Sequence, residues 1–500
     1  MEFTAALEKF KENIRLANAY SHAMGVLSFD SETIAPKNSL EGRAQTYKVF
    51  SEILYKMRVN DEYFEVIDTL EANADKLDEI TAREVELASE SLKDIRNIPM
   101  DEYIEYRGVV AHAQNAWVEA KQTDNFELFA PHLEKIIAFN KRVASLVSPD
   151  KDPYDYLLDG YEKGLDMKTL DAFFEKVRAS LVPLIKKVQQ KGDIIRMDFM
   201  QRSCPVEIQR KLSDYIMQVM HINRDDCAIA ETEHPFTTEN NKHDVRITTH
   251  YHENNLVSNM YSVIHEGGHA LYELNTGDEL IGSPVAGGTS MSVHESQSRF
   301  YENIIGRSES FIKLIFPKIK ELFPEQFSDV SEHELYLAVN RAKPSLIRTE
   351  ADELTYALHI MIRYELEKSL IHGDITVEEL PGEWNRLYKE YLGVDVPNNS
   401  EGVLQDVHWS CGMIGYFPSY ALGSAYGAQI VEAIKKDLDI DKLILENRLD
   451  VITSWLTERI YKYGKLLKAC DAVKKATGEE FDPQYFIDYL TDKYTKIYGL

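Results

Sequence analysis

The chain has 500 residues, of which 44% are hydrophobic, so it is long enough to bury a sizeable core. Its net charge is −27, from 56 basic and 83 acidic side chains. This balance argues against binding to nucleic acid or to an anionic membrane surface, because both need clustered Lys and Arg side chains.

Cysteine usage and the N-terminal stretch both indicate a reducing compartment. The four cysteines, at 204, 227, 411 and 470, are far apart and form no C-x-x-C motif, so no disulfide framework is expected. The first residues mix both charges and lack the apolar core of a signal peptide. No run of about eighteen apolar residues is present. We therefore expect a cytoplasmic protein without a membrane span.

Residues 1 to about 227 are predicted to form one helix after another. Apolar side chains recur there at spacings of three and four, which is typical of helices with one buried face. The predicted helix starts are a capping box at Thr81-x-x-Glu84, N-caps at Asp101 and Asp166, and Pro205 in a first turn. Residues 27–45 interrupt the pattern and predict a turn before a helix rather than the lining of a cleft.

Near residue 228 the hydrophobic period changes from helical to strand-like. Val245, Ile247 and Thr249 alternate with polar side chains, which predicts a strand. The run 233–238 can pair with this strand across a polar turn at 239–242. An edge strand here can hydrogen-bond an extended peptide, although an ordinary hairpin explains the pattern as well.

The strongest motif is His-Glu-x-x-His at residues 265–269. On a helix, His265 and His269 lie one turn apart on the same face and can bind one metal ion. Glu266 then lies beside the metal, where it can take a proton from a bound water molecule. Apolar residues recur at helical spacing from 256 to 272, so the motif falls within a predicted helix. A chance match of so short a motif is the competing explanation.

Two glycines, Gly267 and Gly268, lie inside this helix. Each costs roughly 1 kcal/mol relative to alanine, so a purely structural helix gains nothing from them. A helix that must let another backbone or a substrate come close does gain, because glycine has no side chain in the way. We expect the end of a peptide to lie against the metal at these glycines.

A catalytic zinc ion needs three protein ligands and one open position for water. Candidates for the third ligand are Glu295, which follows His269 by 26 residues (295 − 269), and the neighbouring His294. A glutamate at about this spacing is the arrangement in one large group of zinc peptidases. Adjacent helical residues point about 100° apart, so only one of the two can face the metal, and we favour Glu295. Glu302 is either a support for the ligands or a surface charge.

Peptide hydrolysis at such a site also needs donors for an oxyanion and a group that binds the substrate. His408 and either Tyr416 or Tyr420, in a glycine-rich stretch, are candidate donors, although a histidine beside Trp409 is more often a packing residue. Arg348 precedes a predicted helix and can hold a carboxylate through two parallel hydrogen bonds.

Two alternatives to this use of Arg348 remain open. The first is a salt bridge from Arg348 to Glu350 or Asp352, which makes the residue structural. The second is that Arg246, on the predicted strand, binds the carboxylate instead.

The remaining chain is again mostly helical. The predicted helices are 291–306, 308–324, 333–341, 351–371, 376–392 and a final group from 425. No repeat, low-complexity segment or linker is visible. We expect one domain over residues 1–500, with a helical part to about 227, a metal-site core over about 228–425 and closing helices over about 426–500.

Six ordered motifs spread over about 175 residues now define a resemblance. They are His234-Pro235-Phe236, residues 244–249 (Asp-Val-Arg-Ile-Thr-Thr), residues 265–269, residues 294–297 (His-Glu-Ser-Gln), residues 347–352 (Ile-Arg-Thr-Glu-Ala-Asp) and residues 402–409 (Gly-Val-Leu-Gln-Asp-Val-His-Trp). This set resembles the carboxypeptidase Taq family of zinc metallocarboxypeptidases. One departure is Phe29-Asp30, where the family usually has Trp-Asp.

The resemblance implies a mainly helical, saddle-like fold similar to that of neurolysin, with a deep groove and a small antiparallel sheet beside the zinc ion. It implies removal of single residues from peptides with a free C-terminus, with broad preference, and a homodimer with one zinc ion per subunit, which another divalent metal such as Co²⁺ can replace. The implied roles are zinc ligation by His265, His269 and Glu295, general-base catalysis by Glu266, carboxylate binding by Arg348, donation by His408 and Tyr420, and groove lining by His234 and the 244–249 strand.

Three hypotheses follow for the function. The first is a zinc-dependent carboxypeptidase. The second is an endo-acting oligopeptidase with the same metal site, which lacks a pocket for the terminal carboxylate. The third is a catalytically inactive zinc scaffold that binds peptides, against which the intact Glu266 argues.

Overall fold

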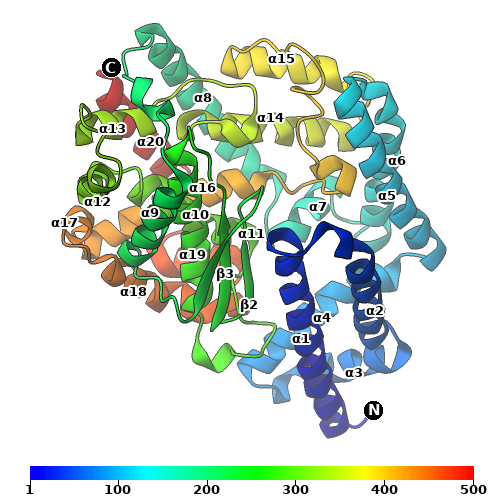
Figure 1. Ribbon diagram of the computed structural model, residues 1–500. Coiled ribbons are helices and arrows are strands. Elements are labelled where there is room, and N and C mark those ends of the chain that lie inside the picture. Colours follow the sequence, from blue (N-terminus) through cyan, green and yellow to red (C-terminus); the bar gives the residue numbers. More distant parts are fainter. The chain divides into compact units, whose positions relative to one another are not determined.

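The computed structural model describes all 500 residues, and most of them are helical (Figure 1). The chain folds into two compact units, each built from separated stretches of sequence. The first unit contains residues 1–92, 196–339 and 430–480, and the second contains residues 93–195, 340–429 and 481–500. One domain over residues 1–500 stays a prediction.

The first unit contains the sheet and the helices that surround it. Its helices are α1 (Phe3–Thr33), α2 (Leu40–Arg58), α3 (Asp61–Glu71), most of α4 (Glu79–Asn97), α9 (Val206–Val219), α10 (Leu256–Leu274), α11 (Met291–Arg299), α12 (Glu309–Leu322), α13 (Glu332–Val339), α17 (Ile440–Leu445), α18 (Leu449–Arg459) and α19 (Ala469–Thr477). One part of its core is formed by α1, α3 and α4, which bury Phe10, Ile67 and Leu92.

The second unit is entirely helical apart from its loops. Its helices are α5 (Met100–Thr123), α6 (Ala130–Val147), α7 (Pro153–Tyr161), α8 (Met167–Lys191), α14 (Glu353–His372), α15 (Leu380–Leu392), the first part of α16 (Pro418–Asp437) and α20 (Gln484–Tyr498). Helix α14 is buried on almost every side, and its Arg363 is fully buried.

The sheet has three strands in the order β1 (Cys227–Glu231), β3 (Asp244–Thr249), β2 (Thr237–Asn241) (Figure 1). Strand β3 pairs with β2 in antiparallel fashion and with β1 in parallel fashion. The alternation of β3 places Val245 and Ile247 in the core, where α10 packs against this strand.

The predicted mainly helical fold with a small sheet is confirmed, but two details of the sheet were wrong. The sheet is mixed rather than antiparallel, because β1, which has no alternating pattern, adds a parallel strand. The predicted turn at 239–242 belongs mostly to β2, and the chain turns at residues 242–243. The residues Glu239 to Asn241 resemble a turn in the sequence because they are all polar, although they form an edge strand.

Three predicted helix starts need correction. Pro205 precedes α9 as its N-cap and does not lie in the first turn. Helix α4 is capped by Asp78, whose Oδ1 accepts a hydrogen bond from the Thr81 amide at 2.9 Å, so Thr81 lies inside the helix. Helix α5 begins after Pro99, which places Asp101 in the first turn rather than at the cap. The cap at Asp166 is confirmed, since its side chain accepts a hydrogen bond from the Thr169 amide.

The predicted turn within residues 27–45 was also wrong over its first part. Helix α1 continues to Thr33, and the break falls at the residues around Pro36. Phe29 is almost fully buried there, with its ring edge-on to Phe236 and the Arg246 guanidinium above it. This ring therefore packs α1 against the sheet. The family usually has tryptophan at this position, and phenylalanine keeps an aromatic ring there.

The later helices agree with the predicted order, with two differences. The final group begins at Pro418, in α16, rather than at 425. The predicted helix over 291–306 divides into α11 and a π-helix over Phe300–Ile305. Such wide turns often occur near functional sites. No helix of the protein combines the length and the apolar character needed to cross a bilayer.

Candidate metal centre

Three side chains of the first unit converge at one point. Helix α10 starts at the Asn255 cap and presents His265 and His269 from successive turns, while α11 supplies Glu295. Oε2 of Glu295 lies 3.8 Å from Nε2 of His265 and 3.6 Å from Nε2 of His269. Ligand atoms of all three residues lie within 4.8 Å of one another.

The spacing of these atoms suits a small divalent metal ion. Zinc bonds of about 2.0–2.2 Å in tetrahedral geometry require ligand atoms roughly 3.4 Å apart. The two distances to Glu295 are within a few tenths of an ångström of that value. Two imidazoles and a carboxylate are also a usual ligand set for catalytic zinc. The residues present therefore fit the metal that the sequence predicts.

The outward nitrogen of each histidine is held by another side chain. Nδ1 of His265 lies 2.9 Å from Oε2 of Glu302, and Nδ1 of His269 lies 2.5 Å from Nδ1 of His294. His294 in turn contacts Oε1 of Glu273 through Nε2, at 2.6 Å. Such contacts fix the ring orientation and the tautomer of a metal-binding histidine. His294 and Glu302 thus lie behind the histidines, and neither belongs to the converging group.

The protonation states of His269 and Glu295 also suit metal binding. Burial, with the neighbouring His294, lowers the pKa of His269 to about 3, so its imidazole is neutral at pH 7. Burial acts to raise the pKa of Glu295, but Arg299 and the two histidines hold it well below its usual value. Arg299 donates from Nε to Oε1 of Glu295 at 2.7 Å, which leaves Oε2 directed at the histidines.

Glu266 is positioned next to this group and is only 6% exposed. Its Oε2 accepts a hydrogen bond from the Thr237 hydroxyl of β2 at 2.6 Å. Burial raises the pKa of Glu266, although His265 and the Thr237 bond act in the opposite direction. A buried carboxylate with a raised pKa is suited to accept and then release a proton.

The close approach predicted at the two glycines of α10 is made by other parts of the protein rather than by a substrate. A Cβ atom at Gly268 would lie 2.8 Å from the Gln297 carbonyl oxygen and from Cα of Ser298, in α11. A Cβ atom at Gly267 would lie 2.8 Å from the Met220 side chain. The prediction that a peptide end lies at these glycines was therefore wrong. Gly268 lets α11, which carries Glu295, approach α10 closely, and Gly267 leaves room for the Met220 side chain.

The other predicted residues of the first unit are His234 and Arg246. The Arg246 guanidinium forms a two-point salt bridge with Asp244, at 2.6 Å and 2.8 Å, and lies above the Phe29 ring. This pairing makes Arg246 a weaker candidate for a substrate carboxylate. His234 is exposed in the loop before β2, and its role stays a prediction.

In the second unit Arg348 is buried beside a carboxylate that is far away in sequence. Its Nε and Nη2 both lie 2.9 Å from Oδ1 of Asp406, and its Nη1 donates to the Tyr356 hydroxyl at 3.1 Å. Neither Glu350 nor Asp352, the partners considered from sequence, forms this pair. Arg363 binds the other oxygen of Asp406, at 2.6 Å and 2.7 Å. We call Arg348, Arg363 and Asp406 the guanidinium cluster.

His408 and Tyr420 lie beside this cluster. Nε2 of His408 is 3.3 Å from the Tyr420 hydroxyl, and the Arg348 guanidinium lies over the Tyr420 ring at 5.0 Å. Burial lowers the pKa of His408 to about 4 and raises that of Tyr420, so both are neutral at pH 7. Tyr416 stacks against His408, but it is Tyr420 whose hydroxyl meets the histidine.

Sequence reasoning assigned no role to several residues that support these sites. Thr237, Glu273, Arg363 and Asp406 are examples. Glu273 follows His269 by four residues on the same helix, and this spacing is a signal that was available. Asp406 lies within a quoted motif, but nothing in the sequence pairs it with Arg348, 58 residues away.

Comparison with known proteins gives matches over nearly the whole chain. Residues 9–494 match the family described as Carboxypeptidase Taq (M32) metallopeptidase. Carboxypeptidase 1 of Bacillus subtilis is 42% identical over 501 residues, covering all of both chains. Thermostable carboxypeptidase 1 of Pyrococcus furiosus is 36% identical, covering 95% of this chain and 96% of its own. The crystal structure of the M32 carboxypeptidase from Deinococcus radiodurans R1 superposes with a TM-score of 0.94 at 32% identity, covering 99% and 100%.

Proposed function

Because the chain belongs to the carboxypeptidase Taq (M32) family of metallopeptidases, and is thus a metallocarboxypeptidase acting on peptides, we propose a specific reaction for it. The protein removes single residues from peptides with a free C-terminus, with broad preference. It uses one zinc ion per subunit, held by His265, His269 and Glu295, and another divalent metal such as Co²⁺ can replace zinc.

The chemistry at this site divides between the metal and the side chains of the protein. A bound zinc ion lowers the pKa of its water toward neutrality and polarises a carbonyl group. Glu266 accepts the proton of the attacking water and later delivers it to the leaving amine. The Thr237 hydroxyl, 2.6 Å from Glu266, holds this carboxylate in place.

His408 and Tyr420 act as donors to the oxyanion that develops on the substrate carbonyl. Their pKa shifts support this role, because both groups stay neutral and can donate a hydrogen bond at pH 7. A donor that is already oriented costs little reorganisation when the charge develops. Their mutual contact at 3.3 Å limits the freedom of both side chains.

Arg348 binds the C-terminal carboxylate of the substrate. Its contacts to Asp406 and Tyr356 use three of the five N–H groups of the guanidinium. One N–H remains on each terminal nitrogen, and together these two form a fork suited to a carboxylate. This fork favours the exopeptidase over the endo-acting alternative, which has no use for it.

The observation that carries the proposal is the convergence of three ligand atoms beside a buried Glu266. It also argues against an inactive zinc scaffold, which needs no buried base. The homodimer and the cytoplasmic location stay predictions.

A single experiment tests the reaction. Zinc-loaded protein is incubated with one peptide that has a free C-terminus and with the same peptide amidated, and the products are followed by mass. A ladder of one-residue losses that forms much faster from the free peptide than from the amidated one is the expected result. Internal fragments from both peptides would favour the endo-acting alternative, and no cleavage of either would favour the scaffold.

A further inference from the structure

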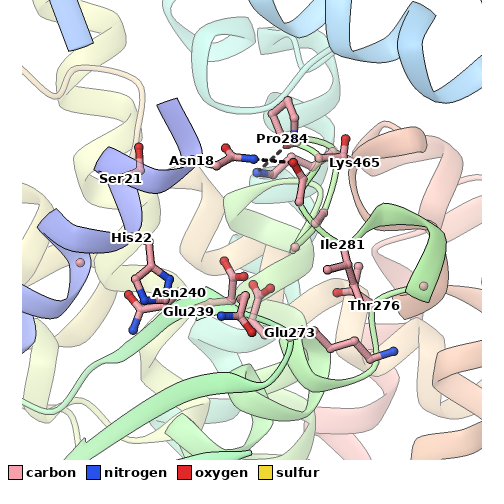
Figure 2. A pocket seen from close by; sticks show the side chains of 18 of the residues that line it. Asn18, Ser21, His22, Glu239, Asn240, Glu273, Thr276, Ile281, Pro284 and Lys465 are labelled. Atoms are coloured by element: carbon pink, nitrogen blue, oxygen red, sulfur yellow. Dashed lines mark hydrogen bonds between the residues drawn. The ribbon is translucent and has the colours of Figure 1, made fainter. Parts of the chain in front are cut away.

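The first unit contains a cavity of about 690 Å³ that the proposed mechanism does not use. Its walls come from α1, β2, the end of α10 and the loop after it (Figure 2). Glu239, Asn240 and Glu273 lie together on one side, and Asn18, Pro284 and Lys465 lie on the opposite side (Figure 2). The cavity therefore has one side rich in oxygen atoms.

Several oxygen atoms on that side have no hydrogen-bond partner. Oε2 of Glu273, Oγ1 of Thr276 and Oδ1 of Asn240 are buried and unpaired. Glu273 and Thr276 are only 6% and 3% exposed, so water does not replace the missing partners freely. Four groups that accept hydrogen bonds, counting the Glu239 carboxylate, thus line one wall. Buried acceptors without donors are costly, and a ligand rich in N–H groups removes that cost.

The lysines of the cavity are directed elsewhere. Lys465 donates from Nζ to the Pro284 carbonyl oxygen at 3.4 Å, across the cavity from Glu239 (Figure 2). Lys242 forms an ion pair with Asp278. Burial, and next the charge of Glu273, raise the pKa of Glu239 to about 7, although Lys465 acts to lower it. Glu239 is therefore a carboxylate without a cation bound directly to it.

The cavity lies along the same two elements as the reacting residues. Strand β2 places Thr237 against Glu266, and Glu239, two residues later, projects to the same side of the strand. On α10, Glu273 follows Glu266 by seven residues, which is two turns on the same face and roughly 10 Å along the helix axis. An extended peptide covers that distance with about three residues.

We propose that this cavity binds a primary ammonium group of the peptide substrate, about three residues on the N-terminal side of the bond that is cut. The inference rests on the proposed carboxypeptidase function. An ammonium group carries three donors and no acceptor, which matches a wall whose oxygen atoms lack hydrogen-bond partners. The C-terminal carboxylate of a substrate is repelled by the same wall. The group is either the α-ammonium of a tetrapeptide or the side chain of an internal lysine.

The test compares substrates that differ only in this amine, at pH 7. One pair is a tetrapeptide with a free or an acetylated N-terminus. The other is a longer acetylated peptide with lysine or norleucine three residues before the C-terminal residue. Each is assayed with the parent, with Glu239→Gln, and with Glu207→Gln as a control, since the Glu207 side chain is 87% exposed on α9. Hydrolysis of the uncharged peptides at the parent rate also shows that each variant is folded.

We expect the parent to hydrolyse at least one amine-bearing peptide with a kcat/KM about tenfold higher than its uncharged match. Glu239→Gln should abolish that advantage, mainly through KM, and Glu207→Gln should retain it. If Glu239→Gln removes the advantage in the tetrapeptide pair, the group bound in the cavity is the α-ammonium. If it removes the advantage in the other pair, the bound group is the lysine side chain. Equal rates within both pairs would overturn the cavity assignment and leave the proposed function intact. If no peptide lost its C-terminal residue, the proposed function would fail and this inference with it.

Discussion

Two buried groups of charged side chains differ in sign. The metal centre of the first unit has an excess of negative charge, and the guanidinium cluster of the second unit has an excess of positive charge. Around the metal centre, the carboxylates of Glu266, Glu295 and Glu302 outnumber the guanidinium groups of Arg299 and Arg307. In the guanidinium cluster, Arg348 and Arg363 share the single carboxylate of Asp406.

This difference indicates what each site is missing. Buried charges are costly unless they are paired, so a surplus at a buried site implies a ligand of the opposite sign. The surplus of negative charge around His265 and His269 suits a metal cation. The surplus of positive charge at Arg348 suits a carboxylate.

Removing a metal ligand should abolish activity. His269→Ala takes away one of three converging ligand atoms, and we expect loss of bound zinc and a fall in kcat/KM of at least about a thousandfold. Metal analysis after dialysis, together with peptide hydrolysis, measures both effects. Glu295→Gln should behave in the same way. Full zinc content and near-parental activity in His269→Ala would show that the metal binds elsewhere.

Changing the guanidinium cluster should leave the metal in place. Arg348→Lys keeps the charge but loses the planar fork, so we expect kcat/KM for a free C-terminus to fall about a hundredfold with unchanged zinc content. The rate for the amidated peptide should change little, so the preference between the two peptides should shrink. If the preference were undiminished, Arg348 would not be the carboxylate-binding residue.

The two sites also differ in how far sequence could predict them. His265 and His269 could be predicted because helical geometry brings positions i and i+4 together, and Glu295 because its spacing from His269 is familiar. The partner of Arg348 could not be predicted, because Asp406 reaches it through tertiary packing. The sequence also does not show which side of α11 faces α10, so His294 remained an alternative ligand. The glycines at 267 and 268 indicated a close approach, but not that α11 makes it at Gly268 and the Met220 side chain at Gly267.

Acid should weaken the second unit through His408. Its pKa of about 4 is below the value near 6.5 of an unfolded chain, so between these values the unfolded chain binds a proton that the folded protein does not. The free energy of unfolding should therefore fall by up to about 3 kcal/mol as the pH drops from 6.5 to 4. His408→Gln should reduce this loss, measured as urea midpoints at pH 7 and pH 4.5, with the exposed His112→Gln as the matched control. Parallel midpoints for parent and His408→Gln would contradict the assignment.

The smallest expected effect concerns the contact behind His269. His294→Ala removes the acceptor for Nδ1 of His269 and the link to Glu273, and we expect a 10- to 100-fold loss of zinc affinity. At saturating zinc, kcat should stay within about tenfold of the parent, because the ligand atoms and Glu266 remain. His294→Asn places an oxygen near the position of Nδ1 and should recover part of the affinity. Competition with a chelator measures the zinc Kd for all three proteins. If His294→Ala bound zinc with unchanged affinity, the excess negative charge around the metal would set that affinity, and the contacts from His269 through His294 to Glu273 would not.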